Sequence, residues 1–231
     1  MESVQLFLAG DSTMSNYDSN AYPRMGWGQV LPMFFNEELV VRNHAASGRS
    51  TKSFIAEKRW ETMEKDFRPG DFVFIQFGHN DQKPDVERRT EPYTSYQQNL
   101  TYFIQRAREH RVTPILLTSI TRRHFDENGQ LLDTHGDYPQ AMRALANKEQ
   151  VACVDMLIKT TEAVQQLGLE KSKQWYMWIN SGQFKGYPDG EQDDTHLREE
   201  GAKKIASICV HELIKLNHPL ATYVNKSEVS K

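Results

Sequence analysis

The chain has 231 residues, of which 38% are hydrophobic and 26% charged, and its formal net charge at pH 7 is −3. These values are typical of a globular protein with a buried core of its own, and they argue against a disordered chain. The net charge is small and no half of the chain is basic, so the composition does not indicate a nucleic-acid partner.

The N-terminal segment does not resemble a secretion signal. Its apolar run has only about six residues and follows an acidic second residue, whereas a signal has a basic start and a long apolar core. No stretch approaches the roughly 18 apolar residues of a membrane-spanning helix. We therefore expect a cytoplasmic protein with no membrane partner. Cys153 and Cys209 are expected to be buried free thiols, although the sequence leaves one disulfide between them open.

Five short runs rich in Val, Ile, Leu and Phe predict strands at residues 4–10, 39–45, 71–78, 113–119 and 151–156. The runs are continuous rather than alternating, which indicates strands covered on both faces. Segments with helical periodicity occupy residues 27–38, 54–67, 93–110, 139–150, 155–168 and 198–216. This alternation of strands and helices predicts an α/β fold with a doubly wound parallel sheet.

We expect one domain over residues 1–231, because no linker, repeat or low-complexity tract divides the chain. Two predicted loops, 78–92 and 120–138, are longer than a connection needs, which is typical of loops that form a site. Segment 172–197 fits no regular pattern. Pro32 lies inside the first predicted helix and is expected to kink or shorten it.

The first candidate site residue is Ser12, in the stretch LFLAGDST at 6–13. The first predicted strand stops at glycine, and Ser12 follows at its carboxyl end, where open parallel sheets bind their ligands. The same residues also fit an ordinary turn that is stabilised by the side chains of Asp11 and Thr13. Ser12 alone therefore does not decide between a nucleophile and a turn.

The second candidate is the stretch DDTHL at 193–197, which is expected to form a short loop before the last predicted helix. An aspartate three residues before a histidine can turn its carboxylate onto the imidazole and leave the other ring nitrogen free as a base. Asp194 also lies within reach of His196, and Asp194 or Thr195 can instead cap the helix. The spacing favours Asp193 as the orienting acid.

Two further loops carry hydrogen-bond donors. GHND at 78–81 follows the third predicted strand, and NHAASGRST at 43–51 follows the second. If the first three strands are neighbours in the sheet, both loops converge on Ser12. An asparagine amide and a glycine N–H are the donors that an oxyanion needs. Each loop alone is a plausible turn, but together these elements meet the requirements of acyl transfer.

GDS at 10–12, Gly48, GHND at 78–81 and DxxH at 193–196 resemble, in order and spacing, the four blocks of the SGNH (GDSL) hydrolases. Within that superfamily the chain is similar to the rhamnogalacturonan acetylesterases, through GDSTM with a following GWGQ, NHAASGRSTKSF, QFGHND, the TRRHF to YPQAM segment and DDTHLREEGA. The resemblance covers nearly the whole chain. It implies a three-layer αβα, flavodoxin-like fold with a central five-stranded parallel sheet.

The resemblance also implies roles for individual residues. It implies Ser12 as nucleophile, His196 as base and Asp193 as orienting acid, with the backbone N–H groups of Ser12 and Gly48 and the amide of Asn80 as oxyanion donors. The implied reaction removes acetyl groups from carbohydrate, above all from pectic rhamnogalacturonan fragments, through an acyl-serine intermediate. It implies neither a metal nor another cofactor.

Several side chains are candidates for substrate contacts. Trp27 and Trp178 can offer flat faces to sugar rings, and Arg49 and Arg122 can bind uronate carboxylates. His79 is expected to shape the oxyanion loop and to contact the substrate. Large aromatic residues more often pack in the core, however, and arginines more often lie on the surface.

Other functions stay open. The chain can be an SGNH esterase of other specificity, such as an acetylxylan esterase, a thioesterase or a lysophospholipase, or a carbohydrate-binding protein without catalysis. The polar loops argue against a lipid pocket, and an Asp-His pair directed at a serine argues against binding alone. Neither His79 with Asp81 nor His124 with Asp126 has the spacing of a zinc site.

Overall fold

The five predicted strands form one parallel sheet in the computed structural model, which describes residues 3–229. The strand order is β2-β1-β3-β4-β5. The strands are β1 (Val4–Gly10), β2 (Leu39–Asn43), β3 (Phe72–Gln76), β4 (Thr113–Leu117) and β5 (Ala152–Val154). Because β2 and β3 flank β1, the loops that follow these three strands leave the sheet side by side at its carboxyl edge.

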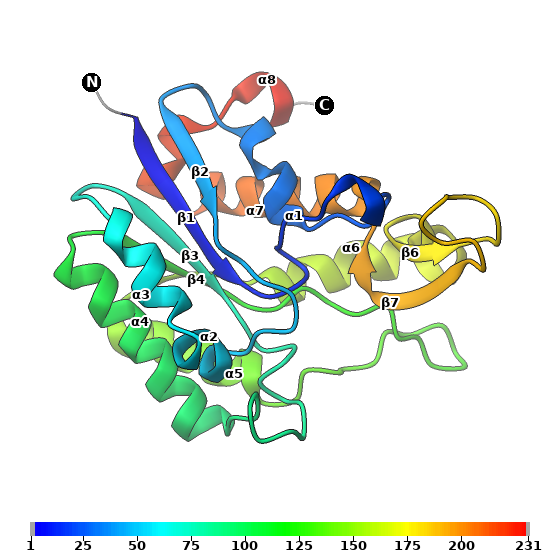
Figure 1. The fold of residues 1–231 in the computed structure, drawn as a ribbon, viewed down its shortest axis with the longest axis horizontal. Helices are drawn as coiled ribbons and strands as arrows, with labels where there is room; N and C mark the ends of the chain where they lie inside the picture. The colour runs from blue at the N-terminus through cyan, green and yellow to red at the C-terminus, as the bar shows by residue number, and fades with distance from the viewer. Residues whose placement is uncertain (1–2, 230–231) are drawn as a thin grey trace.

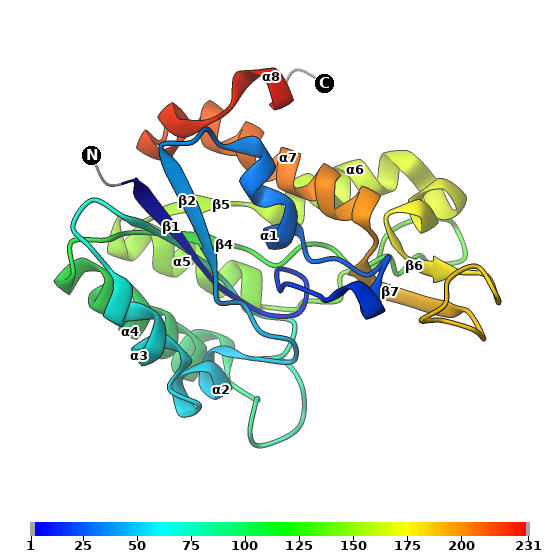
Figure 2. The ribbon, with the colours of Figure 1, turned by 45° about the horizontal axis from the view of Figure 1, so that its top comes forward.

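Helices cover both faces of the sheet and make three layers (Figures 1 and 2). Leu6 and Leu8 of β1 belong to the core on one face, whereas Phe7 and Ala9 belong to the core on the other face. The first face is covered by α1 (Trp27–Val30), α6 (Met156–Lys171) and α7 (Glu199–Lys215). The second face is covered by α2 (Thr51–Ala56), α3 (Arg59–Met63), α4 (Gln97–Glu109) and α5 (Tyr138–Glu149). The predicted αβα fold is confirmed.

Two predicted helical segments do not form continuous helices, and the first is shortened at Pro32 as expected. The segment 27–38 forms only α1 and the 3-10 helix η2 (Leu31–Phe34), which contains Pro32. The segment 54–67 is divided into α2, α3 and the 3-10 helix η3 (Glu64–Asp66), because Lys58 adopts a left-handed conformation with φ 57° between α2 and α3. Proline and a left-handed residue each interrupt the backbone hydrogen bonds of a helix, so neither segment continues as one element.

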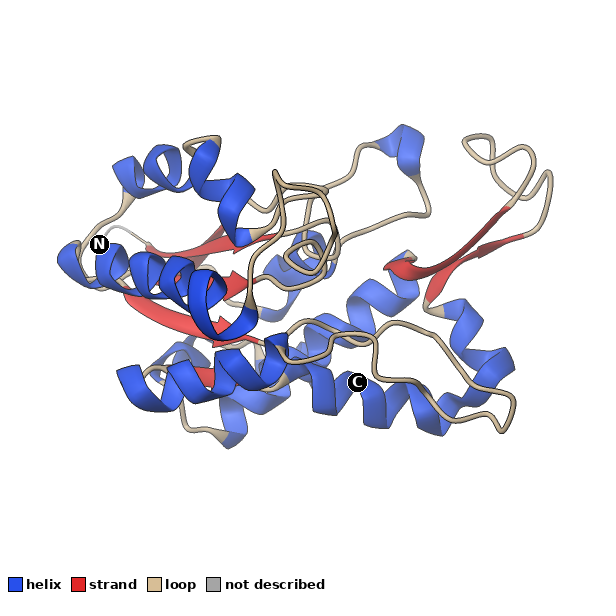
Figure 3. Ribbon diagram, turned by 90° about the horizontal axis from the view of Figure 1, so that it is seen from below, coloured by secondary structure: helices blue, strands red, loops and turns tan. Residues whose placement is uncertain are grey.

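A two-stranded hairpin occupies most of the segment that fits no sequence pattern. Strands β6 (Tyr176–Ile179) and β7 (Glu191–Leu197) pair antiparallel, and in Figure 3 the hairpin extends beyond the carboxyl ends of the main sheet. The expectation of a short loop for DDTHL is therefore wrong, since these residues lie in β7. Tyr176 pairs with Leu197 but Met177 pairs with Asp193, so the residues between them bulge out of β7. A bulge of this kind turns side chains away from their regular direction.

Short elements complete the described chain. They are the 3-10 helices η1 (Ser19–Ala21), η5 (Ser172–Gln174) and η6 (Pro219–Tyr223), the π-helical turn η4 (Pro92–Tyr96) before α4, and α8 (Lys226–Val229). Cys153 and Cys209 are free thiols, as expected; Cys209 is buried in the core on one face of the sheet, whereas Cys153 is only partly buried and packs against the core on the other face. None of the described helices is long and apolar enough to cross a bilayer.

Candidate active site

Ser12 lies in a tight turn directly after β1. The Asp11 carboxylate accepts hydrogen bonds from the backbone N–H and the hydroxyl of Thr13, both at 2.9 Å. The Asp11 carbonyl accepts from the N–H groups of Met14 and Ser15. The turn predicted for the GDST stretch is therefore confirmed: Asp11 and Thr13 stabilise it, and it fixes Ser12 at the carboxyl edge of the sheet, where a nucleophile can act.

The GWGQ stretch packs α1 against this turn. A Cβ on Gly26 would lie 2.1 Å from the Ser15 carbonyl oxygen, and one on Gly28 would lie 2.5 Å from that of Met14. Only glycine permits this approach. Trp27, between them, has no exposed surface and donates its indole N–H to Gln76 at 2.9 Å. The expectation that Trp27 contacts substrate is wrong, because its ring is part of the core.

Ser12, His196 and Asp193 form a hydrogen-bonded series. His196 Nε2 lies 2.9 Å from Ser12 Oγ, and His196 Nδ1 lies 2.6 Å from Asp193 Oδ2. A carboxylate only accepts hydrogen bonds, so Nδ1 carries the proton and Nε2 is left to accept from the serine hydroxyl. Burial raises the pKa of Asp193, but the hydrogen bonds and charge of His196 outweigh it and hold that pKa well below its usual range. The carboxylate therefore stays ionised and keeps the ring in this tautomer.

The neighbouring acid, Asp194, has other partners. Its Oδ1 accepts from Arg123 Nη1 and from Trp178 Nε1, both at 2.7 Å. The Trp178 ring also packs against the Arg123 guanidinium and the Lys173 amine, each 4.7 Å from its centroid. Asp194 is thereby held away from His196. Trp178 is half-buried and lies outside the lining of the cavity at Ser12, and its contact with substrate stays a prediction.

Gly48 and Asn80 lie on the loops after β2 and β3 and line the same cavity as Ser12. The Asn80 amide is oriented by two contacts: Nδ2 donates to the Arg49 carbonyl at 3.1 Å, and Oδ1 accepts from Arg88 at 3.3 Å. One Nδ2 hydrogen remains for another acceptor. Among residues 3–229, the backbone N–H groups of Ser12 and Gly48 donate to no protein acceptor. The cavity thus has three donors available to an oxyanion.

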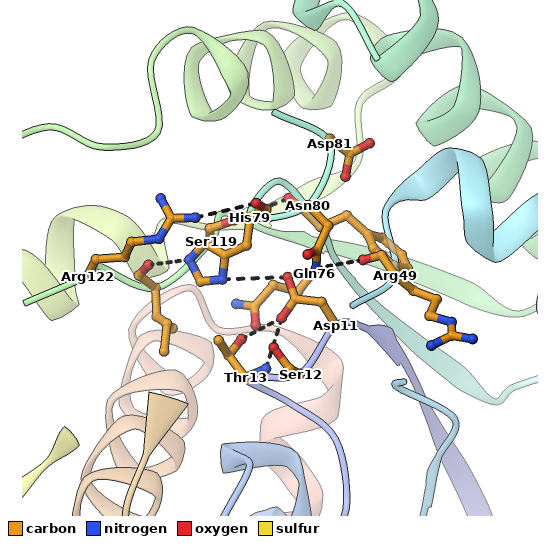
Figure 4. Close-up of polar contacts among 12 residues, drawn as sticks. Asp11, Ser12, Thr13, Arg49, Gln76, His79, Asn80, Asp81, Ser119 and Arg122 are labelled. Atoms are coloured by element: carbon orange, nitrogen blue, oxygen red, sulfur yellow. Dashed lines mark hydrogen bonds and ion pairs between the residues drawn. The ribbon is translucent and has the colours of Figure 1, made fainter. Parts of the chain in front are cut away.

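The Arg49 side chain does not face this cavity. Its guanidinium binds Glu57, which follows α2, at 3.0 Å and the Ser47 carbonyl at 2.7 Å. Figure 4 shows it directed away from the side chains of His79 and Asp11. A substrate contact of the Arg49 side chain stays a prediction, whereas the Arg49 carbonyl orients Asn80.

Asp81 joins the two donor-bearing loops beneath the surface. Its buried carboxylate accepts from the backbone N–H of Thr51 at 3.1 Å and from the hydroxyls of Thr51 and Thr90. Burial raises the pKa of Asp81 to about 7, against the lowering effect of these hydrogen bonds. Thr51 begins α2 just after Gly48, so Asp81 ties the loop of Gly48 to the loop of Asn80.

His79 connects the turn of Ser12 to the loop of Asn80. Its Nε2 donates to the Ile120 carbonyl at 3.1 Å, and its Nδ1 lies 3.6 Å from the Asp11 carboxylate (Figure 4). Burial raises the pKa of Asp11, but the charge of His79 and the hydrogen bonds from Thr13 lower it below its usual value. The His79 ring packs against the His135 ring in a tilted arrangement, with centroids 4.8 Å apart and an interplanar angle of 33°. Both sides of the nucleophile turn are therefore fixed by buried polar contacts.

The cavity over Ser12 has a volume of about 400 Å³. Besides the residues of the hydrogen-bonded series, Gly48 and Asn80, its lining includes the expected contacts His79 and Arg122. It also includes four residues that the sequence does not single out, namely Tyr17, Arg24, Lys83 and Arg88. Lys83 and Arg88 lie in loop 78–92, whose unusual length is the one signal that indicates them.

No group of three or more histidine, cysteine, aspartate or glutamate side chains within residues 3–229 is arranged to hold a metal. The two pairs considered from the sequence have other contacts. Asp81 binds threonines, and Asp126 accepts from the backbone N–H groups of Asn128 and Gln130 in a turn.

An αβα fold whose parallel sheet carries a hydrogen-bonded serine, histidine and aspartate at its carboxyl edge defines the class of serine hydrolases. The sequence model of the GDSL-like lipase/acylhydrolase family matches residues 8–204. The chain belongs to this family. The fold and family expected from the four sequence blocks are thus confirmed.

Two curated relatives match almost the full chain. The rhamnogalacturonan acetylesterase RhgT of Bacillus subtilis is 43% identical over 97% of this chain and 96% of its own length. The probable rhamnogalacturonan acetylesterase YesY of the same organism is 36% identical over 96% of this chain and 97% of its own length. Among solved structures, Axe2, an acetylxylan esterase from Geobacillus stearothermophilus, has a similar fold, with a TM-score of 0.65 at 16% identity over 92% of this chain and 95% of that protein.

Proposed function

We propose that this chain is a serine esterase that removes acetyl groups from carbohydrate, with rhamnogalacturonan fragments as its substrate. One observation carries the chemical part of the proposal: His196 Nε2 lies 2.9 Å from Ser12 Oγ while His196 Nδ1 faces an ionised carboxylate. The substrate part rests on two relatives that are named as established or probable rhamnogalacturonan acetylesterases.

Acylation begins at Ser12. Its oxygen attacks the acetyl carbonyl carbon while His196 Nε2 removes the hydroxyl proton, and the carbonyl oxygen becomes an oxyanion. The N–H groups of Ser12 and Gly48 and the free Asn80 amide hydrogen stabilise this charge. The intermediate then collapses, the bond to the sugar oxygen breaks, and His196 gives its proton to that oxygen. The deacetylated sugar leaves and acetyl-Ser12 remains.

Deacylation repeats these steps with water. His196 removes a proton from a water molecule, whose oxygen attacks the acetyl carbon of acetyl-Ser12. The same donors stabilise the second oxyanion. When the bond to Ser12 Oγ breaks, His196 returns the proton to the serine and acetate leaves. Asp193 stabilises the imidazolium that forms in both halves of the reaction.

The lining of the cavity supports a carbohydrate rather than a lipid substrate. Arg24, Lys83, Arg88 and Arg122 surround it, and its other residues are mostly polar. A pocket for a long acyl chain needs aliphatic walls, because burying a chain against charged groups leaves those groups desolvated. The small acetyl group needs no such wall.

Acetate release tests this proposal directly. The purified chain is incubated with acetylated rhamnogalacturonan oligosaccharides, acetylated xylo-oligosaccharides, 4-nitrophenyl acetate and a lysophospholipid, with Ser12→Ala as the matched control. We expect the highest kcat/KM on the rhamnogalacturonan fragments, and a loss of about 10³-fold or more in the control. Equal turnover by Ser12→Ala would overturn the mechanism, and a preference for xylan or lipid would overturn the substrate.

A further inference from the structure

Four cationic side chains line the cavity, and only some of them have an acidic partner in the protein. They are Arg24, Lys83, Arg88 and Arg122. Arg24 lies 3.7 Å from Asp193 and 3.8 Å from Glu191. Arg88 forms an ion pair with Asp85 at 2.6 Å. These two guanidinium groups therefore have acidic partners within the protein.

Arg122 has no such partner. Only 8% of its surface is exposed, yet its guanidinium donates to neutral acceptors alone, namely the Thr134 carbonyl at 2.9 Å, the Thr134 hydroxyl and the His79 carbonyl at 3.4 Å. No carboxylate within residues 3–229 forms an ion pair with it. Burial lowers the pKa of Arg122 and the charge of Asp11 raises it, but the Asp11 carboxylate faces His79. A buried cation without an acidic partner is costly unless an anion joins it.

Lys83 adds a second unneutralised cation to the lining of the cavity. Its side chain is exposed and, in the part of the chain that the structure describes, pairs with no acidic group. Its backbone N–H donates to the Asn80 carbonyl at 3.1 Å, while Arg122 donates to the carbonyl of His79. Both cations are therefore attached to the loop that carries the Asn80 amide, and Figure 4 shows Arg122 beside this loop.

The cavity itself holds little negative charge to balance them. Asp193 is the one carboxylate in its lining, and that carboxylate binds His196. Excess positive charge in a concave site attracts anionic substrates and favours their binding. A guanidinium and a carboxylate form short, charge-assisted hydrogen bonds, often two in parallel, which also fix orientation.

We propose that Arg122 and Lys83 form a carboxylate subsite, which binds the acid group of a uronate in the acetylated saccharide while its acetyl ester lies at Ser12. This inference rests on the proposed function. It makes the two residues determinants of specificity for acidic over neutral sugar esters. Neither residue takes part in proton transfer or contacts the reacting bond.

The test compares two substrates that differ only in charge. Acetylated galacturonate-containing oligosaccharides are used with free carboxylates and as their methyl esters, and acetate release gives kcat/KM for each. We expect the wild-type chain to prefer the free acid by about tenfold or more, and this preference to fall as ionic strength rises. Lys83→Gln and Arg122→Gln should each reduce the preference about threefold or more, mainly through KM on the acid.

Two further variants make the test decisive. Lys83 is exposed, so Lys83→Glu should fold even if Arg122→Gln, at a buried position, does not. Lys83→Glu should also lower the preference for the free acid more than Lys83→Gln does. Lys204→Gln removes an exposed lysine of α7, away from the cavity lining, and should leave the preference unchanged. A wild-type chain that hydrolyses both substrates equally, or a preference that survives the Lys83 variants, overturns the subsite while the esterase stands. Absence of acetate release from every substrate, 4-nitrophenyl acetate included, overturns the proposed function itself.

Discussion

Asp194 Oδ1 lies 2.7 Å from Nη1 of Arg123, a guanidinium that is almost fully buried. The backbone N–H of Arg123 also donates to the Asp194 carbonyl at 2.8 Å. This double contact fixes β7 against the loop that follows β4, and it removes Asp194 from competition for His196. The choice between the two adjacent aspartates is thus made by a residue 71 positions earlier in the chain.

Exchange of each aspartate for asparagine should separate their roles. In Asp193→Asn the new amide donates to Nδ1 of His196, so the ring proton moves to Nε2, which no longer accepts from Ser12. We expect kcat to fall by about 10⁴-fold. In Asp194→Asn the side-chain oxygen still accepts from Arg123 and Trp178, so kcat should stay within about tenfold of wild type while the free energy of unfolding falls by about 1–2 kcal/mol.

Steady-state kinetics and urea unfolding of both variants check this prediction. Equal losses of kcat in the two variants would show that the carboxylate of Asp194 also acts on His196. Unchanged kcat in Asp193→Asn would exclude it as the orienting acid.

The sequence predicts the sheet well because its strands are short, continuous apolar runs, a pattern typical of strands that are buried on both faces. Strand β1 has the predicted bounds, Val4–Gly10. Strand β7 is missed because Glu191–Leu197 is polar and does not alternate; its pairing with β6 is a tertiary contact that no local pattern encodes. The same limit explains Trp27, whose ring type fits both a sugar platform and a packed core.

The four blocks predict the residues around Ser12 because each block lies at the end of a strand or near the start of a helix, where the fold brings it to one edge. The cations of the cavity are a different case. Arg122 and Arg123 are adjacent in sequence, yet Arg122 lines the cavity and Arg123 holds Asp194. Only the path of the loop after β4 decides which of the two faces the cavity.

Loss of the Asn80 amide should slow catalysis without weakening substrate binding. Asn80→Ala removes one donor to the oxyanion, which exists only in the transition state, so kcat should fall about 10²–10³-fold with little change in KM. Arg49→Gln is a suitable control, since it leaves in place the backbone carbonyl that orients Asn80 and should retain normal kcat. A change confined to KM in Asn80→Ala would assign the amide to substrate binding instead.

Replacement of Gly26 should lower both stability and activity, because the Gly26 backbone packs closely against the turn of Ser12. A Cβ in Gly26→Ala would meet the Ser15 carbonyl oxygen at 2.1 Å, and the backbone must shift to relieve the contact. We expect a loss of about 1–3 kcal/mol in the free energy of unfolding. Because a displacement of about 1 Å in a catalytic group can cost 10²-fold, kcat should fall as well.

Gly182→Ala provides the comparison. Gly182 has a φ of 73°, but a Cβ there meets nothing within 4 Å. Its replacement should therefore cost about 1–2 kcal/mol of backbone strain and leave kcat unchanged. Normal activity and stability in Gly26→Ala, measured by thermal unfolding and acetate release, would contradict the close packing of α1 on this turn.

Asp81 should make the stability of the protein depend on pH in an unusual direction. Its pKa in the folded chain is raised by burial from an ordinary 3.8 to about 7, so the folded state binds this proton more tightly than the unfolded state does. The proton's contribution to stability is complete below about pH 4 and is lost as the pH rises through about 7. Its size is at most about 4 kcal/mol, from 1.36 kcal/mol per pKa unit. The side chain of Asp81→Asn cannot ionise, so the stability of this variant lacks the pH dependence that Asp81 contributes.

Urea unfolding of the wild type and Asp81→Asn at pH 4.5, 6.0 and 7.5 measures the contribution of Asp81 to the free energy of unfolding. The titration of other groups cancels in the difference between the two chains. We expect the stability of the wild type, relative to the variant, to decrease across this range. Parallel curves would mean that the Asp81 carboxylate is already ionised at pH 4.5. In that case its hydrogen bonds to Thr51 and Thr90 outweigh the cost of burying its charge.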